Sequence, residues 1–187
     1  MQRLALFDLD RTLIDLDAAF LRWAEEFGEV RRRFALTDPV EELWAAYRRR
    51  MPSLVQCYPG VLDGLAELRA AGWRVGIVTN GMADNQLGKI QRTGLADVVD
   101  GYAVSGAEGV RKPEPGLFQI AAQRCGVTLA GGGWMVGDSL VADVEGARTA
   151  GLRAIWIDRG TWQGHEHHAD HVVSDVLEGI AIMRQAQ

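Results

Sequence analysis

Two aspartates and a threonine near the N-terminus offer groups suited to phosphoryl transfer, in the segment Phe7-Asp8-Leu9-Asp10-Arg11-Thr12-Leu13. The apolar residues 4–7 predict a short buried strand, so Asp8 falls where that strand ends. Alternate side chains of an extended chain point the same way, so the carboxylates of Asp8 and Asp10 would share one face. Two such charges repel unless a cation or an added proton relieves them. The segment predicts a nucleophile and an acid/base group that share a divalent metal ion, whereas an isolated pair of this kind usually marks a solvated acidic turn.

Two later segments carry groups that could bind phosphate oxygens or offset their charge. Thr79 and Asn80, a hydroxyl and an amide, follow a second predicted strand. Lys112 precedes a predicted helix start, and the sequence has only one other lysine, Lys89. Taken alone, the first segment fits a capped turn and the second a solvated loop. They are candidate site residues only if the fold brings them close to Asp8 and Asp10.

A further acidic pair ends another predicted strand, in Gly137-Asp138-Ser139-Leu140-Val141-Ala142-Asp143. Asp143 lies about one helical turn beyond Asp138, a spacing that can aim both carboxylates at one cation. Glycine before Asp138 permits a close approach of the backbone. These two aspartates are therefore candidate metal ligands.

Helical and extended patterns alternate along the chain beyond residue 60. Strands are predicted at 73–78, within 98–105, at 134–136 and at 153–157, and a helix is predicted at 141–150. Such alternation favours a parallel sheet with helices on both faces, in which ligands bind at the carboxyl ends of the strands. The predicted fold class is therefore α/β with a doubly wound parallel sheet.

Residues 15–57 interrupt this alternation with two amphipathic helices. Their apolar faces share the helical i, i+3, i+4, i+7 spacing and comprise Phe20, Trp23, Ala24 and Phe27, then Val40, Leu43, Trp44 and Tyr47. Asp38 is predicted to cap the second helix, with Pro39 at its first position and Glu41 three residues after the cap. We expect a small helical cap at 15–57, placed over the end of the first strand, and a catalytic core at 1–14 and 58–187.

Composition excludes several classes of protein. The 187 residues are 48% hydrophobic and 24% charged, which fits one globular domain with a full core. A net charge of -5 gives no electrostatic case for nucleic acid or an anionic membrane surface as a partner. No apolar run approaches the roughly 20 residues that span a bilayer, and the N-terminus leads straight into the first strand, so we expect a cytoplasmic location. Cys57 and Cys125 are predicted to be reduced packing residues, and the oligomeric state cannot be predicted.

In order and spacing, these segments resemble the four motifs of the haloacid dehalogenase-like (HAD) hydrolase superfamily, and the resemblance extends over nearly the whole chain. Asp8 to Thr12 is similar to the first motif, Thr79-Asn80 to the second, Lys112-Pro113 to the third, and Gly137-Asp138 with Asp143 to the fourth. The resemblance implies a Rossmann-like core with a short helical cap of the first type. It also implies a phosphatase that acts on a small phosphorylated metabolite.

The resemblance also implies a role for each matching residue. Asp8 would be the nucleophile that becomes an aspartyl phosphate, and Asp10 the acid/base group. Thr79 and Asn80 would bind the phosphoryl oxygens, and Lys112 would offset charge between the phosphate and Asp8.

A magnesium ion is implied as cofactor. Its ligands would be Asp8, the backbone carbonyl of Asp10 and Asp138, with Asp143 as a further ligand or a supporting residue. Arg11 stands where the superfamily most often has glycine, and a surface ion pair is its expected role.

Other functions stay open on the sequence. A phosphotransferase or mutase would pass the phosphoryl group to a sugar instead of water, and a phospho-accepting signalling or binding domain would use an aspartate at a similar strand end. A dehalogenase is disfavoured because that branch lacks the second aspartate, which Asp10 supplies here.

Two conspicuous groups of residues have simpler explanations. The histidines lie at positions 165, 167, 168 and 171, within a polar stretch that lacks a helical ligand spacing, so a metal site there is disfavoured. The six tryptophans are expected in the core, although Trp23 or Trp44 could contact substrate.

Overall fold

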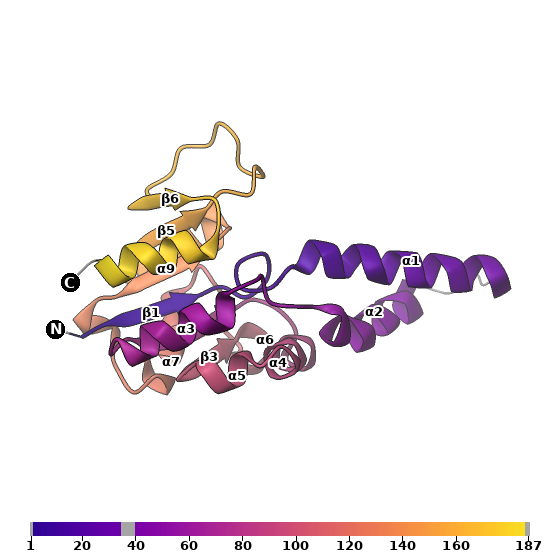
Figure 1. Ribbon diagram of the computed structural model, residues 1–187, viewed down its shortest axis with the longest axis horizontal. Coiled ribbons are helices and arrows are strands. Elements are labelled where there is room, and N and C mark those ends of the chain that lie inside the picture. Colours follow the sequence, from indigo (N-terminus) through magenta and orange to yellow (C-terminus); the bar gives the residue numbers. More distant parts are fainter. Residues whose placement is uncertain (1, 35–39, 186–187) are drawn as a thin grey trace.

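A six-stranded parallel sheet forms the centre of the computed structural model, which describes residues 2–34 and 40–185 (Figure 1). The strand order is β3-β2-β1-β4-β5-β6, and every neighbouring pair is parallel. The strands are β1 (Leu4–Phe7), β2 (Arg74–Thr79), β3 (Gly101–Val104), β4 (Trp134–Gly137), β5 (Arg153–Ile157) and β6 (His171–Val173). The predicted α/β class with a doubly wound parallel sheet is confirmed.

Helices connect the strands and cover both faces of the sheet. The α-helices are α1 (Leu16–Phe34), α2 (Val40–Leu54), α3 (Val61–Ala70), α4 (Ala83–Arg92), α5 (Leu95–Val98), α6 (Ser105–Glu108), α7 (Pro115–Arg124), α8 (Gly146–Thr149) and α9 (Val176–Gln185). Two short turns complete the set, the 3-10 turn η1 (Leu129–Gly131) and the π-helical turn η2 (Leu140–Glu145). None of the described helices has the length and apolar character needed to cross a membrane.

Strand β1 is completely buried because its alternate side chains enter two separate cores. Ala5 and Phe7 pack in the core that includes residues of α3 and α9. Leu4 and Leu6 pack in the core that includes residues of α7 and α8. Burial of a leucine or phenylalanine side chain contributes about 1.5–3 kcal/mol. These two cores fix β1, and with it the position where Asp8 leaves the sheet.

The strand order reverses at β1, which lies between β2 and β4. Phe7, the last residue of β1, is in register with Ile77 on one side and Val136 on the other. In sheets of this kind, ligands bind where the order reverses, beyond the carboxyl ends of the strands. The residues that follow β1, β2 and β4 therefore surround the expected ligand crevice.

Helices α1 and α2 form a hairpin that extends away from the sheet (Figure 1). An edge-to-face contact of Trp23 with Tyr47, at 5.3 Å between ring centroids, joins the two helices. Trp44 is 53% exposed, so the expectation that all six tryptophans lie in the core is wrong at this position. The predicted cap at Asp38 and Pro39 lies outside the described residues, and the division into cap and core at residues 15 and 57 stays a prediction.

Other local expectations also differ from the structure. The helix predicted at 141–150 begins instead as η2, in which the Ser139 hydroxyl accepts a hydrogen bond from the Ala142 N–H and the Asp143 carboxylate accepts one from the Ser139 N–H. These bonds turn Asp143 back toward the end of β4. Strand β6 and helix α9 were not predicted from the sequence.

Candidate active site

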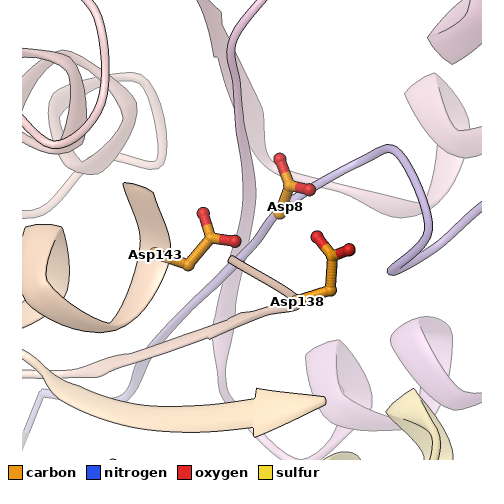
Figure 2. A group of neighbouring side chains, drawn as sticks. All are labelled: Asp8, Asp138 and Asp143. Carbon is orange, nitrogen blue, oxygen red and sulfur yellow. The ribbon is translucent and has the colours of Figure 1, made fainter. Parts of the chain in front are cut away.

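Three carboxylates converge beyond the carboxyl ends of β1 and β4 (Figure 2). Asp8 directly follows β1, Asp138 directly follows β4, and Asp143 lies in η2. One ligand oxygen from each lies within 4.8 Å of the others, and in residues 2–34 and 40–185 this is the one group of at least three acidic, histidine or cysteine side chains that could hold a metal ion. A set of carboxylate oxygens is the donor set that a hard cation such as Mg²⁺ prefers.

Lys112 places a positive charge between two of these carboxylates. Its Nζ lies 2.6 Å from Asp8 Oδ1 and 2.7 Å from Asp143 Oδ1, and the residue is only 3% exposed. Asn80 holds the Lys112 backbone from both sides, because its Nδ2 donates to the Lys112 carbonyl at 3.0 Å and its Oδ1 accepts from the Lys112 N–H at 2.9 Å. The Asn80 amide, expected to bind phosphate, thus has one N–H left for that purpose.

The electrostatic balance of this cluster favours a further cation. Burial raises the pKa of Asp8, while Lys112 lowers it and Asp143 raises it again. Burial also raises the pKa of Asp138, to about 6, with Asp143 adding to the shift. For Lys112, burial opposes the charge, but the carboxylates of Asp143 and Asp8 outweigh it and raise its pKa. One ammonium among three carboxylates leaves an excess of negative charge that a divalent cation would relieve.

Asp10 faces a different set of partners. Its Oδ1 lies 2.7 Å from Lys89 Nζ, and its Oδ2 accepts from Gln86 Nε2 at 3.0 Å. The same Gln86 Nε2 donates to Thr79 Oγ1 at 2.7 Å, so the hydroxyl hydrogen of Thr79 stays available to another acceptor. Lys89 and Gln86 were not predicted as site residues. The rarity of lysine and the position of their helix after Thr79 were the signals that could have identified them.

Arg11 adopts a left-handed backbone conformation, with φ at 59°. Its Nε pairs with Asp17 Oδ2 at 3.0 Å, which confirms the expected ion pair. The guanidinium reaches further than expected, because its Nη1 also lies 3.5 Å from Asp138 Oδ2 and 3.3 Å from Thr161 Oγ1. Arg11 thus links the first motif to the fourth at the rim of the carboxylate cluster.

Histidines and cysteines contribute no comparable cluster in the described part of the chain. His168 Nδ1 lies 2.9 Å from Glu145 Oε1, and the ring of His167 packs against Trp156. Cys125 is buried and Cys57 half-buried, and both are free thiols, as predicted.

Comparisons with known proteins agree with this fold and arrangement. The haloacid dehalogenase-like hydrolase family model matches residues 16–151. A phosphoserine phosphatase of Thermus thermophilus is 39% identical over 151 residues, which cover 76% of this chain and 59% of that protein. A glyceraldehyde 3-phosphate phosphatase of Methanopyrus kandleri is 36% identical over 142 residues, which cover 74% of this chain and 60% of the relative.

A solved structure gives a match over a greater length. The HAD phosphatase of Thermococcus onnurineus superposes with a TM-score of 0.73 at 29% sequence identity, covering 98% of both chains. The chain spans about three fifths of the length of the two curated relatives. With its four motifs gathered at the reversal of a parallel sheet and a family match over most of its length, the chain belongs to the haloacid dehalogenase-like hydrolases.

Proposed function

We propose that the protein is a magnesium-dependent phosphatase that hydrolyses a small-molecule phosphate monoester through an aspartyl phosphate on Asp8. The contact of Lys112 Nζ with Asp8 at 2.6 Å and Asp143 at 2.7 Å carries this proposal. It puts a fixed positive charge beside the candidate nucleophile, where an anionic phosphoryl group must approach. The phosphatase names of the two curated relatives support the same reaction class.

In the first step, a carboxylate oxygen of Asp8 attacks phosphorus, and the bond from phosphorus to the leaving oxygen breaks. Asp10 gives its proton to that oxygen, so the alcohol departs neutral. Lys112 offsets the repulsion between Asp8 and the phosphoryl group. The hydroxyl hydrogen of Thr79, left free by the bond from Gln86, donates to a phosphoryl oxygen.

In the second step, a water molecule attacks phosphorus and the bond between phosphorus and Asp8 breaks. Asp10, now a carboxylate, accepts the proton of that water, so inorganic phosphate leaves and both aspartates return to their starting state. General acid/base catalysis of this kind contributes about 10²–10⁴-fold.

Magnesium would be held by Asp8, Asp138 and the backbone carbonyl of Asp10, and when bound it would neutralise charge on the phosphoryl oxygens. Asp143 has a supporting role in this proposal. One of its oxygens accepts from Lys112 and the other from the Ser139 N–H, at 2.7 and 3.0 Å. It thereby orients the lysine and the turn that carries Asp138.

The decisive variant is Asp8→Asn, assayed with p-nitrophenyl phosphate and a panel of phosphorylated metabolites. Turnover should fall by at least about 10³-fold, because loss of a nucleophile costs more than loss of a general acid or base. The matched control is Asp63→Asn, which changes an exposed aspartate of α3 and should leave turnover unchanged. Circular dichroism should be the same for both variants.

Metal dependence has its own test. A chelator should abolish turnover, and added Mg²⁺ should restore it. Full activity of Asp8→Asn, or undiminished turnover without a divalent metal, would refute the proposal.

A further inference from the structure

Helix α4 turns two polar side chains inward. Gln86 and Lys89 are three residues apart, so they lie on the same face of the helix. Each is only 2% exposed, beside the fully buried Ile90. A buried ammonium is costly unless a charged or hydrogen-bonding partner compensates it. Here the partner is the carboxylate of Asp10, at 2.7 Å.

We propose that Gln86 and Lys89 are the positioning pair for Asp10, and that they hold its carboxylate where it exchanges a proton with the leaving group. This inference rests on the proposed function. Lys89 binds Oδ1 and Gln86 binds Oδ2, so each oxygen of Asp10 has its own donor. Two donors on two oxygens fix the rotation of the carboxylate as well as its position, while each oxygen retains a lone pair for the substrate side.

Gln86 also couples Asp10 to the phosphoryl-binding hydroxyl. Its Nε2 donates to Thr79 Oγ1 at 2.7 Å and to Asp10 Oδ2 at 3.0 Å. A single amide group therefore sets the spacing between the proton-transfer group and the group that would hold the phosphoryl oxygens. Misplacement by about 1 Å in such a pair can cost about 100-fold in rate.

Contacts with the helical hairpin support α4 from its other side. Asn85 Nδ2 donates to the Arg48 carbonyl at 3.0 Å, and Arg48 Nη2 lies 2.6 Å from Asp84 Oδ2. These contacts hold the first turns of α4 against α2, directly next to Gln86. The positioning pair is thus fixed between the hairpin and the site.

The test compares two esters of similar shape, phenyl phosphate and p-nitrophenyl phosphate. Phenolate is the more basic leaving group, so its departure depends more on a proton from Asp10. The value of kcat/KM reports the steps up to phosphoryl transfer to Asp8, which include this proton transfer. Replacing Lys89 with methionine keeps an unbranched side chain that is one atom shorter and removes the ammonium donor.

For Lys89→Met and Gln86→Met, kcat/KM with phenyl phosphate should fall by about 10–100-fold, and the loss with p-nitrophenyl phosphate should be several-fold smaller. Asp10→Asn should show the same preference for the better leaving group. Lys89→Arg, which keeps a cation, should recover part of the loss. The matched control is Arg92→Met, which removes an exposed basic side chain from the same helix and should change neither ester.

A merely structural role predicts a different result. The proposal is overturned if both variants retain the wild-type ratio of the two kcat/KM values while Asp10→Asn lowers the relative rate of phenyl phosphate. Circular dichroism identifies a variant that does not fold, and if Lys89→Met is such a variant, the uncharged exchange Gln86→Met decides alone. Failure of the proposed function has a separate signature, which is undiminished turnover by Asp8→Asn or turnover of neither ester by the wild type.

Discussion

Replacing Lys112 with methionine should weaken the fold and strengthen metal binding at the same time. The ammonium lies 2.6 Å from Asp8 and 2.7 Å from Asp143. At an effective dielectric constant of about 20, each contact is worth about 6 kcal/mol of Coulomb attraction before desolvation. Burial of the charges offsets much of this, and protonation of Asp8 limits the loss further. Removing one partner of a buried ion pair typically costs about 3–5 kcal/mol, and we expect this range.

In a chain of this size, such a loss should lower Tm by about 6–20 °C in the presence of a chelator. The effect of magnesium has the opposite sign. Lys112→Met removes one positive charge from beside the three carboxylates, so the site becomes more negative. The variant should therefore bind Mg²⁺ more tightly, so that saturating magnesium raises its Tm by more than it raises the Tm of the wild type.

The assay is thermal unfolding of the wild type, Lys112→Met and the exposed control Arg92→Met, each with chelator and with saturating magnesium. Turnover of p-nitrophenyl phosphate should remain about 10²–10³-fold below the wild type even with magnesium, because the metal does not replace the charge beside the nucleophile. An unchanged Tm in chelator, or a smaller magnesium-induced rise than in the wild type, would refute the reasoning about this ion pair.

Two further predictions concern pH and packing. Burial and then Asp143 raise the pKa of Asp138 from 3.8 to about 6, so the folded chain keeps this proton longer than the unfolded chain does. In chelator, the free energy of unfolding should therefore decrease as the pH rises from about 4 to about 6, by about 3 kcal/mol from this group. Urea denaturation that shows no such decrease over this range would contradict the shift. Gly76→Ala would put a Cβ 2.6 Å from Cys125 Sγ and should destabilise the fold by about 1–3 kcal/mol. At Gly28, an added Cβ meets no heavy atom within 4 Å, so Gly28→Ala should stabilise α1 by about 0.5–1 kcal/mol. Thermal unfolding of both variants tests this, and equal Tm values would count against the packing argument.

The strands that the sequence predicts are those whose apolar side chains are sufficient to define them. The segment 4–7 is apolar throughout and is buried on both faces as β1. Strand β6 has three residues, of which His171 is half-buried and Val172 exposed, so no comparable pattern marks it. The π-helical turn η2 could not be predicted either, because it depends on hydrogen bonds among Ser139, Ala142 and Asp143 that a helical periodicity does not reveal.

The same distinction applies to the candidate site. Asp8, Thr79 and Asp138 could be predicted to lie together because they follow or end strands, and the carboxyl ends of parallel strands share one edge of the sheet. Gln86 and Lys89 lie inside a helix, where polar residues normally face solvent. Their burial depends on a shared contact with Asp10, which is 76 and 79 residues away in the sequence, and Gln86 has Thr79 as a second partner. A local pattern carries no information about a partner at that distance.

The two lysines show how the fold separates two neighbouring carboxylates into different roles. The sequence predicted that Asp8 and Asp10 would repel each other unless a cation or an added proton relieved the repulsion. In the structure each aspartate already has its own ammonium, Lys112 for Asp8 and Lys89 for Asp10. A lysine ammonium is a compact point charge at the end of a flexible stem, so it can lie beside a single carboxylate oxygen. The chain has eighteen arginines and only these two lysines, and both lysines contact an aspartate of the first motif. Asp8 is thereby directed toward Asp138 and Asp143, and Asp10 toward α4, before any substrate binds.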